Sequence, residues 1–251
     1  MIRKEHEGMV WLEFELLSQF PKLKHGVFLR HGGYSHGDFD SLNLSFNVGD
    51  LAISVKSNEN KVAQSLRLSS IVRGHVVHGK TIVAVNKNSP GTIETSSDGI
   101  ATHETNVGLL MTHADCQAAI FYDPIKHVLA NVHAGWRGSV QDIYGETIAF
   151  MQKTYQSDPK DIHVAISPSL GPYNSEFVNY KEELPEHFWE FQIKPDYFDF
   201  WSISRMQLIG KGIHSDHIQI AEISTYSNPQ DYFSYRRDKK AGRHGTVAAL
   251  V

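Results

Sequence analysis

The chain has 251 residues, of which 41% are hydrophobic and 21% are charged. These fractions are typical of a globular protein and exclude a disordered or fibrous chain. A formal net charge of −4 argues against a protein that binds nucleic acid through a general excess of positive charge. No apolar run approaches the roughly 20 residues that a membrane-spanning helix needs, and the amino terminus lacks the apolar core of a signal peptide. We therefore expect neither a nucleic-acid partner nor a membrane partner.

Cys116 is the single cysteine, so no intrachain disulfide can form. That usage fits a reducing compartment, and we expect a cytoplasmic protein. The sequence shows no internal repeat, low-complexity tract or linker, which predicts one domain over residues 1–251. The oligomeric state stays open.

In chain order, the first distinctive segment is the glycine-rich stretch 26–49, which is expected to be a long loop. Such loops often carry sites, although a plain surface connection explains the glycines equally well. A helix is predicted over 55–68, and residues 86–97 are polar and rich in turn formers. Strands are predicted at 71–77, 81–85, 107–111, 118–122 and 128–132.

The clearest helical pattern follows the glycines of residues 134–138 and continues to Met151. Ser139 and Asp142 resemble a capping box, which places the helix start near Ser139. The later segments are a strand at 161–166, helices at 181–191 and 203–213, and strands at 218–221 and 246–250. Helices and strands interleave along the chain, which indicates an α/β or α+β sandwich.

Cys116 and His133 stand at or beside the ends of central strands, where open α/β sheets place their chemistry. Zinc prefers thiolate and imidazole ligands, and catalytic zinc sites use three protein ligands. One strand–turn–strand unit separates these two residues, so both can meet at one sheet edge, and His78 can complete the set. The spacing alone is a weak signal, because a lone cysteine is more often an inert core residue.

Three other features have ordinary explanations. Residues 98–99 (DG) are by default a turn signal. Residues 236–240 (RRDKK) are by default a solvent-exposed charge run. Trp136 is expected to pack rather than to take part in chemistry.

Short motifs follow one another from about residue 26 to the carboxy terminus: residues 30–35 (RHGGYS), 41–44 (SLNL), 77–79 (VHG), 98–99 (DG), 114–116 (ADC), 133–138 (HAGWRG), 234–238 (SYRRD) and 242–243 (GR). Together they resemble the laccase-domain family, also called the multicopper polyphenol oxidase-like or purine nucleoside phosphorylase family. His113 departs from the family pattern, because a threonine commonly stands before the ADC motif.

The resemblance implies mixed β-sheets flanked by helices, a fold related to the cytotoxic-necrotizing-factor catalytic domain. It also implies a zinc ion bound by His78, Cys116 and His133. Copper fits less well, because multicopper oxidases need several linked histidine-rich sites and these motifs supply ligands for one metal.

The activity implied is zinc-dependent phosphorolysis of adenosine, inosine, guanosine or methylthioadenosine, and some relatives also deaminate adenosine. Phosphorolysis needs an anion site, and Arg137 lies just ahead of a predicted helix amino terminus. Further candidates for binding phosphate or substrate are Arg30, Asn43, Arg236 and Arg243.

Deamination at the purine C6 carbon suits a zinc site, because bound zinc lowers the pKa of water to about 7. It also needs a carboxylate that moves the proton, and Asp115 is the candidate.

Two alternatives remain at this point. In a hydrolase of cell-wall peptide precursors, Cys116 would be the nucleophile and His133 its base. In a metal-dependent binding module, His113 or His103 would supply a fourth protein ligand.

Overall fold

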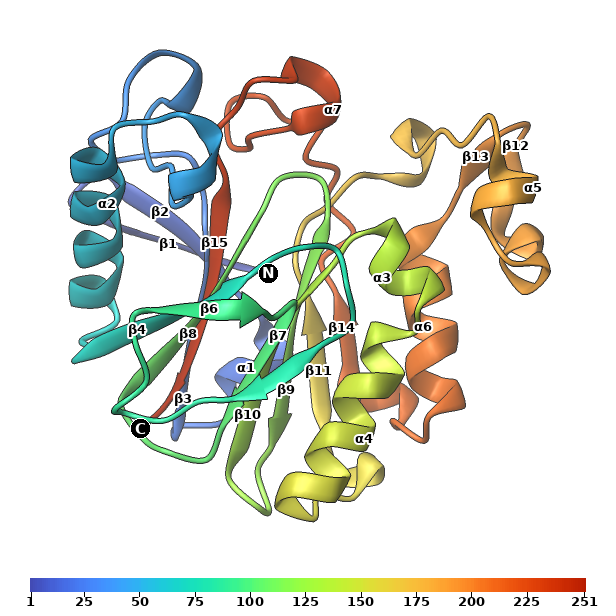
Figure 1. Ribbon diagram of the computed structural model, residues 1–251, viewed down its shortest axis with the longest axis horizontal. Helices are drawn as coiled ribbons and strands as arrows, with labels where there is room; N and C mark the ends of the chain where they lie inside the picture. The colour runs from blue at the N-terminus through green and yellow to red at the C-terminus, as the bar shows by residue number, and fades with distance from the viewer.

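The computed structural model describes residues 1–251 and shows two β-sheets packed against each other, with helices on their outer faces (Figure 1). The first sheet has the strand order β1 (Ile2–His6), β2 (Met9–Glu13), β3 (Leu23–Phe28), β15 (His244–Leu250), β8 (Val107–His113), β4 (Ser70–His75) and β6 (Thr92–Ser96). Neighbours from β1 to β8 are antiparallel, whereas β8, β4 and β6 are parallel. The parallel pairs require crossover connections, and three of these connections carry residues of the candidate site described below.

The second sheet has the order β14 (Ile218–Ile220), β11 (His163–Ile166), β9 (Gln117–Asp123), β10 (Val128–Ala134), β7 (Gly99–Thr102) and β5 (Ile82–Ala84). It is also mixed: β9 pairs antiparallel with both of its neighbours, while β5 and β7 are parallel. Strands β9 and β10 are buried along their whole length. This explains their continuous apolar runs, because both faces of the sheet are covered.

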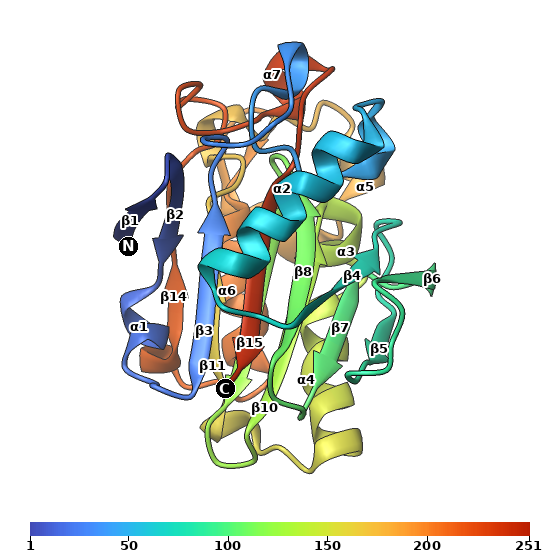
Figure 2. The ribbon, with the colours of Figure 1, turned by 90° about the vertical axis from the view of Figure 1, so that its left-hand side faces the viewer.

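Three apolar layers hold the sandwich together. Leu109 and Met111 from the first sheet pack with Ile120 and Leu129 from the second. Helices α4 (Ile143–Tyr155) and α6 (Phe200–Gly210) cover the outer face of the second sheet. Helix α2 (Ala52–Ser65) lies across the outer face of the first sheet, as Figure 2 shows.

The remaining elements are short. They are the helices α1 (Glu15–Ser18), α3 (Trp136–Val140), α5 (Tyr180–Glu183) and α7 (Tyr235–Asp238), the strands β12 (Gln192–Lys194) and β13 (Tyr197–Phe198), and the 3-10 turns η1 (Gly37–Phe39), η2 (Phe46–Val48), η3 (Pro159–Asp161), η4 (Pro172–Asn174), η5 (Glu186–Phe191) and η6 (Ser215–His217). No helix combines the length and apolar character that crossing a bilayer demands.

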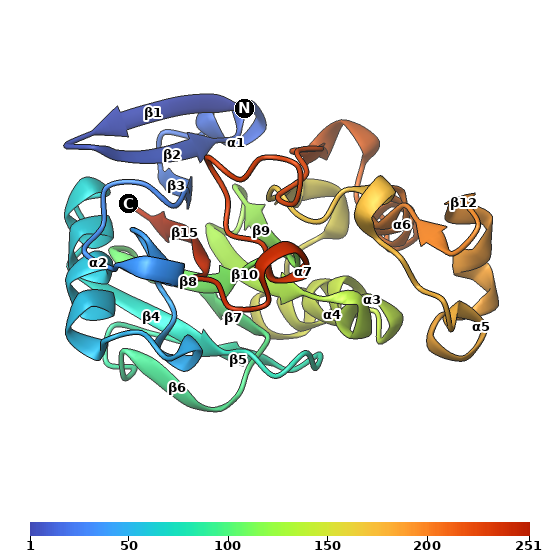
Figure 3. The same cartoon turned by 90° about the horizontal axis from the view of Figure 1, so that it is seen from above.

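Residues 175–200 project from the side of the second sheet as an excursion containing α5, β12 and β13 (Figure 3). The excursion has an aromatic core of its own, which includes Phe177, Phe188 and Phe198. This core continues into α6 through Ile203, so the excursion is anchored to the body of the molecule.

Three connections cross from the first sheet to the second: β4 to β5, β6 to β7, and β8 to β9. They carry His78, Asp98 and Cys116, respectively. Because β4, β6 and β8 run parallel, their carboxyl ends lie at one edge of the sandwich. The topology therefore gathers residues that are distant in sequence.

The predicted α/β sandwich of mixed sheets flanked by helices is confirmed. The predicted helix start at Ser139 is wrong. Helix α3 begins at Trp136, and Asp142 takes a left-handed conformation (φ 56°) and caps a separate helix, α4, by accepting a hydrogen bond from the Gly145 N–H. The predicted helix over 181–191 is also divided, because Pro185 separates α5 from η5.

Candidate metal and substrate site

The three predicted metal ligands lie together. Donor atoms of His78, Cys116 and His133 are all within 4.8 Å of one another. The two imidazole rings are 4.9 Å apart and nearly perpendicular. His133 is buried, Cys116 is partly buried and His78 is exposed, so the group faces outward on one side. One thiolate and two imidazoles in this arrangement could hold a metal ion.

Asp98 orients two of these residues. Its buried carboxylate accepts hydrogen bonds from the backbone N–H groups of Val77 (3.2 Å), His78 (2.8 Å) and Gly79 (2.8 Å). It also lies 3.0 Å from His133 Nδ1. Burial alone would raise the pKa of Asp98, but the hydrogen bonds from His133 and the backbone outweigh burial and lower it. The Asp98 carboxylate therefore fixes the turn that carries His78. Because it engages Nδ1 of His133, it leaves Nε2 of that ring free to face the other two donors, and the cluster of His78, Cys116 and His133 is called the metal group below.

Gly135 gives the three ligands the space they occupy. A Cβ atom at this position would lie 2.7 Å from His78 Nδ1 and 3.1 Å from Cys116 Sγ. Any larger residue would therefore push the ligand side chains apart.

The negative charge of the Cys116 thiolate and the positive charge of the His133 imidazolium stabilise each other. Burial raises the pKa of the Cys116 thiol, but attraction and hydrogen bonding to His133 and His78 outweigh it and lower the pKa to about 6. For His133, burial lowers the pKa, while the Cys116 thiolate and Asp98 raise it to about 9. The thiolate that a metal ion requires is thus present at neutral pH.

A cavity of about 940 Å³ lies next to this group. Its volume is within the range of small-molecule sites, roughly 300–1,000 Å³. The side chains that line it include four cations, Arg137, Arg236, Lys239 and Arg243, and four aromatic rings, Trp136, Phe177, Phe200 and Tyr235.

The cations come from two places. Arg137 stacks over the ring of Trp136 at 4.4 Å, and the Tyr235 ring has Lys239 at 5.4 Å and Arg243 at 5.6 Å.

Burial lowers the pKa of Arg243. Its backbone N–H donates to Asn43 Oδ1 at 2.9 Å. Asn43 is itself fully buried and does not line the cavity.

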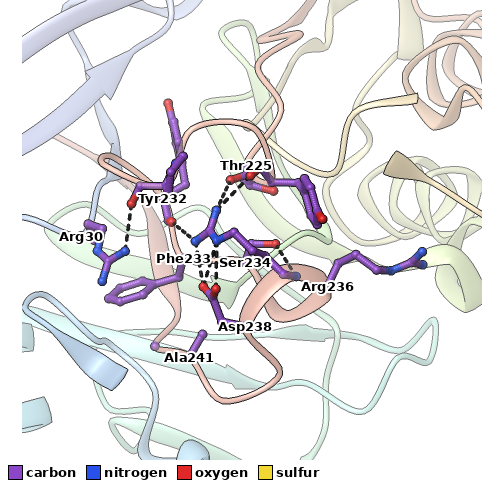
Figure 4. A network of polar contacts seen from close by, with 12 residues as sticks. Arg30, Thr225, Tyr232, Phe233, Ser234, Arg236, Asp238 and Ala241 are labelled. Atoms are coloured by element: carbon purple, nitrogen blue, oxygen red, sulfur yellow. Dashed lines mark hydrogen bonds and ion pairs between the residues drawn. The ribbon is translucent and has the colours of Figure 1, made fainter. Parts of the chain in front are cut away.

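Neighbouring arginines of α7 differ in what they contact, and Figure 4 shows the network around them. Arg237 donates to the carbonyl oxygens of Thr225, Tyr226 and Tyr232 and pairs with Asp238. Arg236 points away from this network and lines the cavity, with a bond of 3.3 Å to the Asn174 carbonyl. Arg237 thus fixes the loop, and Arg236 is left facing the cavity.

Asp115 lies in the cavity wall with both carboxylate oxygens engaged. One accepts from the Thr225 hydroxyl at 2.7 Å and the other from the Arg236 backbone N–H at 2.6 Å. The carboxylate therefore ties α7 to the connection that carries Cys116.

Arg30 lies outside the cavity lining. Its guanidinium donates to the carbonyl oxygens of Asp40 and Pro229. It also stacks on the Phe233 ring at 4.8 Å, and Figure 4 shows these two side chains next to each other. His113 is buried, bonds Thr246 Oγ1 at 2.8 Å and does not join the cluster of three donors.

Sequence reasoning missed part of the site. The local pattern around Asp98 predicts only a turn, and that around Lys239 predicts only an exposed charge run, although both residues lie in or beside motifs of the family. Phe177 and Phe200 carried no sequence signal, because only the packing of the excursion brings them to the cavity.

Residues 24–251 match the family model described as multi-copper polyphenol oxidoreductase laccase. The chain belongs to this family. The resemblance predicted from the motifs is thereby confirmed. Despite the family's name, the structure gathers one cluster of three donors, enough for a single ion.

Among curated proteins, the chain is similar to purine nucleoside phosphorylase YlmD of Geobacillus stearothermophilus, with 32% identity over 90% of this chain and 88% of that protein. It is also similar to a purine nucleoside phosphorylase of Bacteroides thetaiotaomicron, with 28% identity over 92% of this chain and 93% of that protein. The crystal structure of YlmD from Geobacillus stearothermophilus superposes with a TM-score of 0.88 and 29% identity, covering 98% and 97% of the two chains. Structural similarity thus extends over nearly the whole fold.

Proposed function

We propose that the protein is a zinc-dependent purine nucleoside phosphorylase that accepts adenosine, inosine, guanosine or methylthioadenosine. In this reaction, a phosphate oxygen bonds to the ribose C1′ carbon while the glycosidic bond breaks, and the purine nitrogen that leaves takes up the proton that the phosphate loses. The products are a free purine and ribose 1-phosphate, or 5-methylthioribose 1-phosphate from methylthioadenosine. The observation that carries the proposal is that one cavity joins the His–Cys–His group to four cationic side chains. The names of the similar curated proteins support the same activity.

Zinc fits the residues present, and His78, Cys116 and His133 would hold it. A bound zinc ion would supply a positive charge that stabilises negative charge developing in the transition state. Copper in a multicopper oxidase needs several linked sites, and this donor set serves one ion.

Phosphate would bind among Arg137, Arg236, Lys239 and Arg243. Guanidinium groups match phosphate oxygens in pairs, and the partly buried Arg243 lies where water screens its charge less. Asp115 would position Arg236 through the hydrogen bond to its backbone. Because both Asp115 oxygens are engaged, we favour this positioning role in phosphorolysis. To move a proton in deamination, Asp115 would have to release one of these two hydrogen bonds.

Adenosine deamination is a further activity that we propose for the same site, since the metal group faces the same cavity. A hydrolase of cell-wall peptide precursors, with Cys116 as its nucleophile, remains a second candidate because of the environment of this thiol. The Cys116 thiol has a pKa of about 6 and lies beside His133, as in enzymes that use a cysteine nucleophile. Bound metal would mask that thiolate, so metal content separates the candidates.

The proposal is tested by incubating metal-quantified protein with inosine and with adenosine, each with and without phosphate. We expect release of the free base that requires phosphate, with ribose 1-phosphate as the second product. Inosine formed from adenosine would show deamination. In Cys116→Ala, both the bound metal and the turnover should be lost. If protein with one metal ion per chain turns over no purine nucleoside, the proposal is wrong.

The phosphate site has a matched control in the chain. Lys239 lines the cavity, whereas the next residue, Lys240, pairs with Asp38 at 3.0 Å outside it. We expect Lys239→Gln to raise the KM for phosphate at least about tenfold, because a hydrogen bond to a charged group contributes roughly 1.5–3 kcal/mol. Lys240→Gln should leave that KM unchanged, and equal effects of the two variants would argue against the assigned phosphate site.

A further inference from the structure

The excursion places aromatic rings in the wall of the cavity, on the side formed by residues 175–200 and the start of α6. Neither the metal group nor the cationic side chains account for the two phenylalanines there. We propose that Phe177 and Phe200, backed by Trp136, form the subsite for the purine ring and determine the preference for purine over pyrimidine nucleosides. This inference rests on the proposed nucleoside phosphorolysis.

The rings form one continuous surface. The centroids of Phe177 and Phe200 are 5.2 Å apart with an interplanar angle of 34°, and Trp136 meets Phe177 edge to face at 5.8 Å. Phe177 is buried, whereas Phe200 and Trp136 are partly exposed and line the cavity. Apolar ring surface is therefore available to a ligand in the cavity, and a flat aromatic ligand would bury it by stacking.

Hydrogen bonds tie the backbone of Phe200 to the segment that carries Cys116. The Phe200 carbonyl oxygen accepts hydrogen bonds from Gln117 Nε2 (3.1 Å) and the Ser204 hydroxyl (2.7 Å). Gln117 directly follows Cys116, and its Oε1 accepts from the Tyr144 hydroxyl (2.6 Å). The Ser204 oxygen also lies 2.7 Å from this Oε1, so its single proton serves either Gln117 or the Phe200 carbonyl. The backbone of Phe200 is thus fixed through the residue next to Cys116, so little ordering of this segment is needed when a base binds.

The distribution of charge assigns this wall to the neutral part of the substrate. Trp136 has Arg137 stacked on it, and Tyr235 has Lys239 and Arg243 as neighbours. No cation stacks on Phe177 or Phe200. A nucleoside with its base on the phenylalanines would direct its ribose C1′ toward the cationic side chains, where phosphate would bind.

The wall also explains why a purine would be preferred. A bicyclic base covers more of a stacked aromatic surface than a single ring, and stacking on an aromatic side chain contributes a change in affinity of about tenfold to a hundredfold per base. The gain requires a ring at position 200, because a smaller side chain would leave the base without its stacking partner.

The test measures binding of 2-aminopurine riboside to the metal-loaded protein, followed by the quenching of its fluorescence when the base stacks. We expect Phe200→Ala to weaken binding at least tenfold and to remove most of the quenching, while the KM for phosphate stays within about twofold. Phe200→Leu keeps apolar bulk at the start of α6 and should retain the fold but still lose the quenching. Tyr173→Ala is the control, because the Tyr173 ring is 73% exposed and does not line the cavity.

The outcomes separate this inference from the function on which it rests. If the wild-type protein neither binds the probe nor phosphorolyses any nucleoside, the proposed function fails. If the wild type turns over purine nucleosides but Phe200→Leu binds and quenches the probe as the wild type does, the phenylalanine wall is not the base subsite. Weaker binding in Phe200→Leu, with bound metal and phosphate KM unchanged, supports it.

Discussion

Asp98 accepts hydrogen bonds from three backbone N–H groups around His78 and lies 3.0 Å from His133 Nδ1. One carboxylate therefore sets both the position of a turn and the orientation of a ring. Partners that orient metal ligands in this way typically change metal affinity about 10- to 100-fold when removed. We expect a loss of this size in Asp98→Asn, measured by competition with a chelator of known affinity.

The control for this variant is Asp123→Asn. Asp123 is also a fully buried aspartate that accepts backbone N–H bonds, but it serves the turn at Ile125 and Lys126. Its substitution should leave metal affinity unchanged. An equal loss in both variants would mean that Asp98 acts only through general stability.

Two glycines of the HAGWRG motif differ in what surrounds them. A Cβ at Gly135 would lie 2.7 Å from His78 Nδ1 and 3.1 Å from Cys116 Sγ, whereas a Cβ at Gly138 would meet nothing closer than 3.5 Å. We expect Gly135→Ala to lower metal affinity by at least tenfold and Gly138→Ala to have little effect, both measured by metal titration. Full metal binding by Gly135→Ala would show that the ligands can move apart without cost.

The Cys116–His133 pair predicts the pH dependence of the metal-free protein. The pKa of Cys116 is lowered from 9.0 to about 6 and that of His133 is raised from 6.5 to about 9. The thiolate becomes protonated as the pH falls through about 6, and the imidazolium loses its proton as the pH rises through about 9. Their mutual stabilisation is therefore greatest between these values and is lost on either side.

We expect the rate of Cys116 alkylation by iodoacetamide in the metal-free protein to rise with a midpoint near pH 6. In His133→Gln the midpoint should rise to or above the ordinary thiol pKa of about 8.5, because the main opposite charge is gone and burial still raises the pKa. A wild-type midpoint already near about 8.5 would contradict the ion pair.

At the scale of elements, a break separates α3, which carries the cavity residues Trp136 and Arg137, from the longer helix α4. Asp142 makes the break, since it has φ 56°, accepts from the Gly145 N–H and pairs with Lys211 at 2.8 Å. Replacing an N-cap aspartate with alanine costs about 1 kcal/mol, and alanine is also poorly suited to a left-handed conformation.

We therefore expect Asp142→Ala to lower the free energy of unfolding by about 1–2 kcal/mol in chemical denaturation. Asp142→Asn keeps a capping oxygen and tolerates the left-handed region, so it should lose much less. If the asparagine variant were as unstable as the alanine variant, the ion pair with Lys211 would be the main contribution instead.

Several elements were predictable because their burial follows the sequence pattern. The central strands β8, β9 and β10 are buried runs of apolar residues and lie close to their predicted ranges. Strand β1 was missed because four of its five residues are exposed and charged or polar, so no alternation marks it. Strand β6, within the turn-rich stretch, is held mainly by pairing with β4 rather than by its own apolar side chains.

The residues of the candidate site also include some that the sequence predicts and some that it does not. His78, Cys116 and His133 could be expected from motif resemblance, whereas their spacing alone was a weak signal. These three side chains come together because the β4–β5 and β8–β9 connections cross from the first sheet to the second, and no local sequence pattern predicts such a crossing. The separation of Arg236 from Arg237 also depends on distant partners, because carbonyl oxygens at residues 225, 226 and 232 engage only the second arginine.

At the scale of the whole molecule, the cluster of His78, Cys116 and His133 joins the two sheets. His78 and Cys116 lie in connections that cross from the first sheet to the second, and His133 is on β10 of the second sheet. An ion held by all three would therefore restrain both sheets at one edge. A ligand that binds only the folded state stabilises it by about 2.7 kcal/mol at a free concentration of 100 times its Kd.

For a chain of this length, that stabilisation corresponds to a shift of roughly 5–10 °C in Tm. We expect removal of the metal with a chelator to lower the Tm by about this amount, measured by calorimetry, and re-addition of zinc to restore it. Cys116→Ala should show no response to either treatment, because it lacks the thiolate ligand. If chelation removed a stoichiometric metal without changing the wild-type Tm, the ion would not be bound where the two crossing connections meet β10.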